Sequence, residues 1–279
     1  MNSTLRKQVN TAAPNEMTVR NIVLAGLVAA EYKHIVPKLE RVTLTAGQTV
    51  YRAEQKIEAV YFPEDAVVAI IDRMQGGRTV EVGIIGREGI VGMNVFLGGA
   101  ITPDEAIVQI AGDAMCMSAD VLRKETHFGS PLQQLLLGYA RTFLAVLSQS
   151  VACSQHHGIE QRLSRLLLTL NDYTQSREIL LDQASIAALL GVRRAGVSVA
   201  ANRFQGKGML TCRRGVIRVV DRRSLEKSSC ECRRFIRHQY AQFQRTVQSL
   251  SRQGARSRPG GVIGNRPVAG AKRRRVGRS

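Results

Sequence analysis

The sequence predicts an α+β protein with an N-terminal antiparallel β-sandwich or jelly roll, a long helix, and a helical domain toward the C-terminal end. Three observations predict this order. Short apolar strands alternate with glycine turns in the first half, an apolar repeat of period 3.5 follows, and short helices precede a hairpin in the second half. With 279 residues, 44% of them hydrophobic, the chain is long and apolar enough to bury two cores.

Charge divides the chain into a near-neutral front and a strongly basic back. Residues 1–158 carry 14 basic and 15 acidic residues, residues 159–250 carry 17 and 7, and residues 251–279 carry 9 basic residues and no acidic ones. An excess of positive charge attracts polyanions. The back half therefore predicts nucleic acid as the partner, with an anionic membrane as the second choice.

Several classes of protein are disfavoured by the sequence. The longest apolar runs, residues 22–30 and 163–170, are too short to cross a bilayer, and the N-terminal residues lack the apolar core of a secretion signal. Five scattered cysteines do not make a disulfide framework. The sequence contains no nucleophile motif that would indicate an enzyme. The glycines Gly86, Gly89 and Gly92 have the spacing of turns and do not form a phosphate-binding loop. We expect a cytoplasmic protein that is not an enzyme.

The predicted sandwich covers residues 21–129 and follows a polar, flexible leader over residues 1–20. Its strands include residues 66–71, 79–84 and 106–110, and glycine turns separate them. Several strands at a spacing of about 8–12 residues are typical of an antiparallel sandwich or jelly roll.

A long helix and hinge are predicted over residues 130–158, where Ser130 caps the helix and Pro131 takes its first position. Apolar and small residues then recur in alternating steps of three and four. The members of this seam are Leu132, Leu136, Tyr139, Phe143, Val146, Ser150 and Cys153. Periodicity leaves two interpretations open, packing on the chain's own sandwich or a homodimer interface. The DNA-binding features described next favour the homodimer.

Residues 183–202, QASIAALLGVRRAGVSVAAN, have the spacing of a helix-turn-helix. Two short helices that cross steeply need apolar residues at fixed positions, a small residue at their closest approach, and a turn residue that tolerates left-handed backbone. The residues that meet these demands are Ile186, Ala187, Leu190, Gly191, Val192, Val197 and Ala200. Asp182 is placed to cap the first helix. An ordinary helical hairpin would share only part of this pattern.

The second of these helices begins with Arg193 and Arg194, whose guanidinium groups suit guanine edges or phosphates in a major groove. A basic hairpin follows and predicts a wing on the phosphate backbone. The predicted DNA-binding residues are Arg193, Arg194, Ser198, Val199, Asn202, Arg203, Arg213 and Arg214. We therefore expect a winged helix-turn-helix over residues 159–235 and a C-terminal extension with a basic disordered tail over residues 236–279.

A sandwich, a seam helix, a hinge and a winged helix-turn-helix together resemble the Crp/Fnr family of bacterial transcription regulators, over roughly residues 20–235. The resemblance implies a homodimer on a palindromic site in double-stranded DNA, with recognition helices about 34 Å apart, and RNA polymerase as a further partner. The family reads bases with an Arg-Glu pair and a later Arg. Only Arg194 keeps this pattern, because Ala195 and Val199 stand at the other two positions. We therefore expect a different operator and no membrane partner.

The same resemblance implies a cyclic-nucleotide pocket, whose ligands are missing here. Met93 follows Gly92 where the family has Glu, and Asp104 and Glu105 lie near the position of the phosphate-binding Arg. Two carboxylates would repel a phosphate by a few kcal/mol at about 4 Å. The family's iron–sulfur cluster uses cysteines near the N-terminus, whereas the first cysteine here is Cys116. We expect neither cofactor, and the effector stays unassigned.

The other potential metal ligands favour structural roles. Cys230 and Cys232, with Cys212, could hold a metal or form a redox pair, but the Cys-x-Cys spacing is not that of a zinc knuckle. A second trio is His156, His157 and Glu160, which a polar hinge between helices explains more simply. We expect structural or incidental cysteines and no bound metal.

Two functions follow from these patterns. The first is a sequence-specific DNA-binding transcription regulator whose sandwich transmits a signal through the long helix. The alternative is a non-specific nucleic-acid-binding or chromosome-associated protein that acts through its basic C-terminal tail. The tail is also compatible with a solvated end that adds only weak, salt-sensitive affinity.

Overall fold

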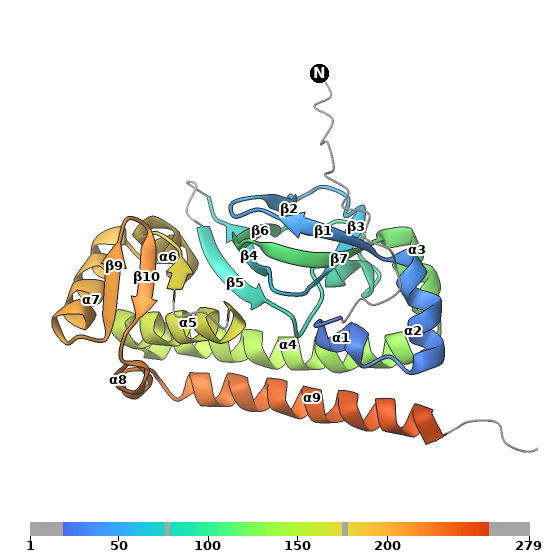
Figure 1. Ribbon diagram of the computed structural model, residues 1–279. Helices are drawn as coiled ribbons and strands as arrows, with labels where there is room; N and C mark the ends of the chain where they lie inside the picture. Colours follow the sequence, from blue (N-terminus) through green and yellow to red (C-terminus); the bar gives the residue numbers. More distant parts are fainter. Residues whose placement is uncertain (1–18, 76–78, 175–177, 257–279) are drawn as a thin grey trace, which may run out of the picture.

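The computed structural model describes residues 19–75, 79–174 and 178–256 of the chain. Figure 1 shows a β-sandwich lying on a long helix, α4 (Pro131–His156), with a second long helix, α9 (Cys232–Arg256), beside α4. A smaller domain of helices and short strands lies at one end of α4 (Figure 1). The predicted α+β class, with its order of sandwich, long helix and winged helix-turn-helix, is confirmed.

Two antiparallel sheets form the sandwich, one with the order β1-β7-β3 and the other with the order β2-β6-β4-β5. The strands are β1 (Glu40–Leu44), β2 (Thr49–Tyr51), β3 (Ala59–Pro63), β4 (Val67–Arg73), β5 (Thr79–Ile85), β6 (Glu105–Ile110) and β7 (Gly112–Ser118). Short helical segments flank them: α1 (Ile22–Ala25), α2 (Ala29–Ile35), η2 (Val36–Lys38), η3 (Met93–Val95) and α3 (Ala119–Glu125).

Strand β4 is buried on both faces, which explains its uninterrupted apolar sequence. Val68 and Ile70 belong to the sandwich core. Val67, Ala69 and Ile71 belong to a second core, which they share with the smaller domain. Because side chains alternate across a strand, both sets must be apolar when both faces are covered. The outer face of the four-stranded sheet is therefore a contact surface for the smaller domain.

The seam on α4 is buried within the chain. Leu132, Leu136 and Tyr139 are fully buried in the sandwich core, and Phe143 is nearly so. Val146 is also buried. The last two members are Ser150, which is partly exposed, and Cys153, which is fully buried. The interpretation of this seam as a homodimer interface is therefore wrong, and packing within the chain takes its place. A helix held between two neighbours in one chain has the same apolar period as a dimer helix, so the period could not distinguish them.

Helix α9 forms the first part of the predicted C-terminal extension, residues 236–279, where the sequence pattern predicted no helix. Its inward face repeats with helical spacing, and its members are Ile236, Tyr240, Phe243, Val247 and Leu250. Phe243 packs against Tyr139 of α4, with ring centroids 5.9 Å apart. The many Arg and Gln residues between these positions lower the mean hydropathy and hide the apolar face. The tail over residues 257–279 lies outside the described residues.

By length and composition, α4 is the single helix among the described residues that could cross a membrane. Helices α6 (Gln183–Leu190) and α7 (Arg194–Gly206) pass the same test only as a sharply bent pair. Core helices of other proteins also have such a composition. The packing of α4 between the sandwich and α9 accounts for its buried apolar residues.

Candidate nucleic-acid interface

The smaller domain contains a helix-turn-helix and a three-stranded sheet of order β8-β10-β9. Besides α6 and α7, its elements are α5 (Ile159–Thr174), β8 (Glu178–Leu180), β9 (Leu210–Arg213), β10 (Val216–Val219) and α8 (Arg222–Lys227). The chain changes direction by 113° between α6 and α7. Gly191 makes this turn with left-handed backbone, at φ 61° and ψ 36°, which glycine adopts without a steric penalty. Asp182 caps α6 by accepting a 2.7 Å hydrogen bond from the backbone N–H of Ser185.

The two helices of the helix-turn-helix pack against each other through the core residues that the sequence spacing predicted. Five of these residues are buried: Ile186, Ala187, Leu190, Val197 and Ala200. Val192 is partly buried against the same core, and Gly191 is exposed in the turn. The small side chain of Ala187 lies next to the turn, where Val192 N–H donates to its carbonyl at 3.0 Å. A larger residue there would separate the two helices.

Arginine side chains occupy the exposed start of α7. Arg193 is the N-cap residue and Arg194 the first residue of the helix, and both are exposed. Val199 and Asn202 are exposed farther along. The free N–H groups at a helix N-terminus also attract anions, so this end suits a phosphate or a guanine edge.

Two other predicted contacts are engaged within the chain. The hydroxyl of Ser198 donates to the side-chain oxygen of Gln183 at 2.6 Å and also contacts the carbonyl of Arg194. The guanidinium of Arg203 pairs with the carboxylate of Glu160 on α5. Both side chains therefore help to hold α7 in place, and their availability for DNA is lower than the sequence suggests.

The wing is a tight hairpin with a basic tip. Arg213 and Val216 pair across β9 and β10, and Arg214 and Gly215 between them both have positive φ, 46° and 79°. Two-residue hairpins of this type favour Asn-Gly, so an arginine in the first position is an unfavourable choice for the backbone. The hairpin therefore places two exposed cations, Arg213 and Arg214, at its tip despite this backbone cost.

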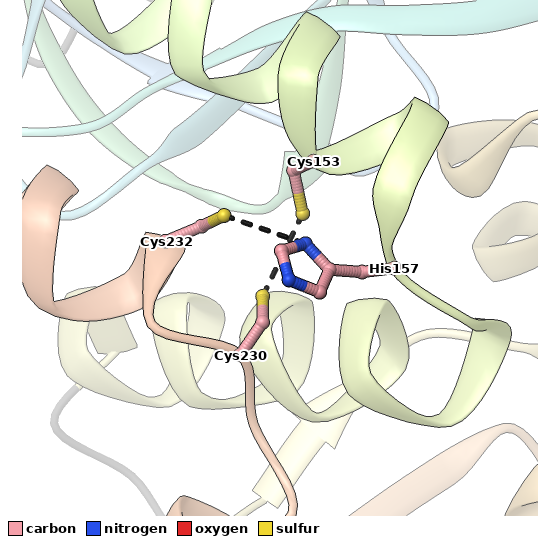
Figure 2. A group of neighbouring side chains, drawn as sticks. All are labelled: Cys153, His157, Cys230 and Cys232. Carbon is pink, nitrogen blue, oxygen red and sulfur yellow. Dashed lines mark hydrogen bonds between the residues drawn. The ribbon is translucent and has the colours of Figure 1, made fainter.

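The structure groups the cysteines differently from the grouping that the sequence suggested. Cys212 lies in the wing, apart from Cys230 and Cys232, so the suggested grouping of these three is wrong. Cys230 and Cys232 instead meet Cys153 and His157 at the end of α4, as Figure 2 shows. The chain separation between the two pairs, 77 residues from Cys153 to Cys230, explains why no sequence motif is visible.

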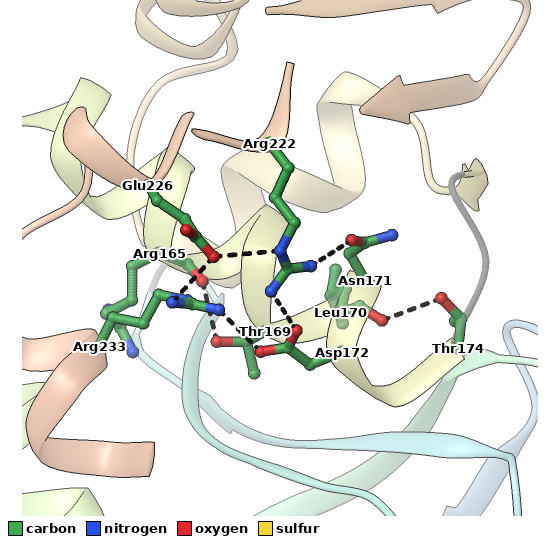
Figure 3. A network of polar contacts seen from close by, with 9 residues as sticks. All are labelled: Arg165, Thr169, Leu170, Asn171, Asp172, Thr174, Arg222, Glu226 and Arg233. Carbon is green, nitrogen blue, oxygen red and sulfur yellow. Dashed lines mark hydrogen bonds and ion pairs between the residues drawn. The ribbon is translucent and has the colours of Figure 1, made fainter. Parts of the chain in front are cut away.

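A network of charges joins α5, α8 and the start of α9 (Figure 3). Asp172 accepts from Arg222 and, at 2.9 Å, from Arg233. Glu226 contacts the same two arginines, at 3.1 and 3.5 Å. Asn171 also accepts from Arg222 at 2.6 Å. These two arginines of the basic back half therefore hold α8 and α9 against α5 and are not free for a polyanion.

The smaller domain is docked on the outer face of the sandwich. A side chain at Gly191 would meet Val80 of β5 at 3.0 Å, and Ile71 of β4 shares a core with Leu190 of α6. A cavity of about 530 Å³ remains between the two, lined by residues of β4, β5 and β6 and by α6. The position of the helix-turn-helix thus depends on contacts with the sandwich.

A partly buried carboxyl lies at this contact. Burial raises the pKa of Glu81 on β5 to about 7, although the nearby guanidinium groups of Arg165 and Arg162 oppose the rise. The ionised group therefore destabilises the folded chain above about pH 7, and the penalty disappears as the pH falls below the ordinary value near 4.5. We expect Glu81→Gln to raise the free energy of unfolding by about 1–3 kcal/mol at about pH 8 and to have little effect at about pH 4.5.

Thermal unfolding at the two pH values measures this difference. Glu58→Gln is the matched control, because the side chain of Glu58 is exposed and its replacement should leave the transition unchanged at both values. A Glu81→Gln variant that is less stable than the native chain at about pH 8 would show that pairing with the arginines outweighs burial.

Asp104 and Glu105, which the sequence placed near an expected phosphate position, make polar contacts within the chain. Asp104 accepts a 2.9 Å hydrogen bond from the hydroxyl of Tyr51, and burial together with this carboxylate raises the pKa of Tyr51. Glu105 is buried and pairs with Arg73. Met93, in η3, has no group to bind a ribose hydroxyl.

The fold and the exposed helix-turn-helix define a DNA-binding protein with a winged helix-turn-helix joined to a β-sandwich. Residues 161–228 match the family of Crp-like helix-turn-helix domains. The chain thus contains a Crp-like DNA-binding domain and has the fold of Crp/Fnr regulators.

Many solved structures match this fold, including the following three. A chain from Eubacterium rectale ATCC 33656, described as a transcriptional regulator of the Crp/Fnr family, is 14% identical, with a TM-score of 0.60 over 74% of this chain and 96% of its own. FixK2 from Bradyrhizobium japonicum is 15% identical, with a TM-score of 0.59 over 69% and 98%. A CRP-family transcriptional regulator from Thermus thermophilus, TTHB099, is 16% identical, with a TM-score of 0.58 over 67% and 95%. No curated protein matches the sequence.

Proposed function

We propose that this protein is a sequence-specific transcription regulator that binds a palindromic site in double-stranded DNA as a homodimer. The observation that carries the proposal is the exposed pair Arg193 and Arg194 at the start of α7, held by a well-packed helix-turn-helix. The strongly basic back half supplies long-range attraction to DNA. Such a surface suits a recognition helix that enters the major groove by its N-terminal end.

Within this interface, different residues have different roles. Arg194 reads a base, because it is the residue that keeps the pattern of the Crp/Fnr resemblance. Arg193 and the wing residues Arg213 and Arg214 bind phosphates and set the orientation. Val199 and Asn202 face the groove farther along the helix. This assignment leaves a single arginine per half-site for direct recognition of guanine.

A second stripe on α4 forms the interface between the two copies. It is exposed, it is separate from the buried seam, and its members are Gln134, Leu137, Arg141, Leu144, Ser148, Val151 and Gln155. Leu137, Leu144 and Val151 are 52%, 60% and 65% exposed, and they are seven residues apart. Apolar residues at every seventh position are typical of two helices that pack along their length. A second copy of α4 is the occupant that this spacing fits.

The sandwich receives the signal and transmits it to the helix-turn-helix. We propose that the effector is not cyclic AMP, because Asp104 and Glu105 lie near the expected phosphate position. An effector would act by changing how the helix-turn-helix is held against the outer face of the four-stranded sheet. The proposal includes RNA polymerase as a partner at the promoter, a cytoplasmic location, and no enzymatic activity.

Selection of bound oligonucleotides from a random pool of duplexes tests the proposed function. We expect a two-fold symmetric motif with half-sites centred about one helical turn apart. Binding without any enriched sequence would contradict the proposal and favour the alternative, a non-specific nucleic-acid-binding protein that acts through its basic tail.

Truncation after Arg256 separates the role of the tail from that of the helix-turn-helix. It removes seven basic residues and leaves α9 complete. We expect the slope of log affinity against log salt to fall by about three units or more, because released counterions scale with the number of phosphates contacted. The preferred sequence should stay the same. A lost preference, measured by repeating the selection, would assign specificity to the tail.

A further inference from the structure

Four side chains with metal-binding chemistry meet where α4 ends and α9 begins (Figure 2). Cys153 lies in the last turn of α4 and His157 is the C-cap residue of the same helix. Cys230 lies in the segment between α8 and α9, and Cys232 is the first residue of α9. The three cysteines are 0–5% exposed and the histidine side chain is 14% exposed. Two segments that are distant in the sequence thus contribute two ligands each.

The spacing of the four ligand atoms fits one tetrahedral ion. The sulfurs of Cys153 and Cys230 are 3.6 Å apart, the sulfur of Cys232 is 3.6 Å from Nδ1 of His157, and all four atoms lie within 4.8 Å of one another. Bonds of about 2.3 Å to sulfur and about 2.0 Å to nitrogen place neighbouring ligands of a tetrahedral zinc about 3.8 Å apart for two sulfurs and about 3.5 Å for sulfur and nitrogen. A disulfide would need about 2.05 Å.

The local sequence explains how each pair faces the same point. Residues four apart lie on one face of a helix, so Cys153 and His157 project together, and the backbone N–H of His157 still donates to the carbonyl of Cys153 at 3.1 Å. On the other side of the site, Glu231 stands between the ligands Cys230 and Cys232 where α9 begins. The network of Asp172 and Glu226 with Arg222 and Arg233 (Figure 3) holds this entry segment against α5.

Further contacts surround the four ligands as they do in metal sites. Nε2 of His157 lies 3.3 Å from the carboxylate of Glu231, so that carboxylate fixes the ring with Nδ1 turned inward. The side-chain amide of Gln149 donates to the sulfur of Cys232 at 3.1 Å. A zinc ion with three thiolates carries one net negative charge, and Arg162 and Arg165 place positive charge near Cys153. The buried sulfurs therefore have the partners that a charged site needs.

We propose that Cys153, His157, Cys230 and Cys232 bind one zinc ion in a closed structural site. Three sulfurs and one imidazole are a common zinc set, and a full set of four protein ligands leaves no open position for catalysis. A two-iron cluster would spread its ligands over two metal ions, which the compact spacing here disfavours. The site joins the end of α4 to the start of α9 beside the hinge. It is independent of the proposed DNA-binding function.

Metal analysis of the purified full-length chain tests the proposal. We expect about one zinc per chain by mass spectrometry of the elements. After removal of the metal under reducing conditions, titration with Co²⁺ should produce the visible bands of a tetrahedral ion and thiolate charge transfer in the near ultraviolet. Iron in place of zinc, a Cys153–Cys230 disulfide in a metal-free chain, or Co²⁺ bound without these bands would overturn the proposal.

Variants locate the site. Cys230→Ser should lose the zinc, whereas Cys212→Ser, which changes a cysteine in the wing, should keep it. Glu231→Gln preserves all four ligands and should weaken zinc binding by about 10- to 100-fold in competition with a chelator. If Cys230→Ser fails to fold, the zinc affinity of Glu231→Gln still tests the proposal. Undiminished zinc in Cys230→Ser, or unchanged affinity in Glu231→Gln, would contradict the assignment.

Discussion

Replacement of Arg194 by alanine should weaken binding to the selected operator by about 30-fold or more, while the chain remains folded and dimeric. A bidentate contact from arginine to guanine contributes about 1–3 kcal/mol per base pair, and a palindromic site loses the contact twice. Specificity should relax at one position in each half-site. Fluorescence anisotropy with the operator and with single-base variants of it measures both effects.

The matched control is Arg245→Ala, which removes an exposed arginine from α9, far along the chain from the helix-turn-helix. It should change operator affinity little. Arg193→Ala should weaken binding to all sequences by a similar factor, as expected for a phosphate contact. If Arg194→Ala keeps the full sequence preference, the residue does not read a base and the assignment of α7 as the recognition helix is wrong.

Replacement of Leu144 by glutamate should convert the dimer into monomers. Leu144 is at the centre of the exposed stripe on α4. The change therefore removes a leucine that the proposed dimer buries in each copy and places two negative charges opposite each other. Burial of a leucine contributes about 1.5–3 kcal/mol, so two copies lose about 3 kcal/mol or more, or about 100-fold in the dimer dissociation constant. Analytical ultracentrifugation measures this constant.

Phe128→Glu is the control for a new charge on an exposed apolar position, because Phe128 is exposed in the loop before α4 and lies outside the stripe. It should leave the dimer intact. Replacement of the buried Phe143 should instead lower the stability of each single chain. A dimer that survives Leu144→Glu, or one that dissociates equally in Phe128→Glu, would place the interface elsewhere.

The helix-turn-helix could be predicted because its requirements are local. A left-handed turn at Gly191, a small residue at Ala187 and a cap at Asp182 depend on neighbours within about twenty residues along the chain. The alternation of strands and glycine turns likewise predicted the sandwich. The roles of Ser198 and Arg203 were harder to predict, because their partners, Gln183 and Glu160, belong to other helices.

What covers each helix face could not be predicted from the sequence. The 3.5 period of α4 is present twice, once on the buried seam and once on the exposed stripe through Leu144. The seam is richer in apolar residues, so the sequence pattern favours it as the interface. Helix α9 takes one side of α4, so the buried seam is satisfied within one chain. A polar composition concealed α9 itself, although its apolar positions follow helical spacing.

Short-range sterics and hydrogen bonds specify the order of the elements, the positions of the caps and turns, and the arginines at the start of α7, so the amino-acid order alone was enough to predict them. Packing between distant segments instead selects which apolar stripe stays exposed on α4 and which sulfurs meet at its end. Both depend on α9 folding back along α4, and such long-range packing leaves no fixed spacing in the chain from which to infer it.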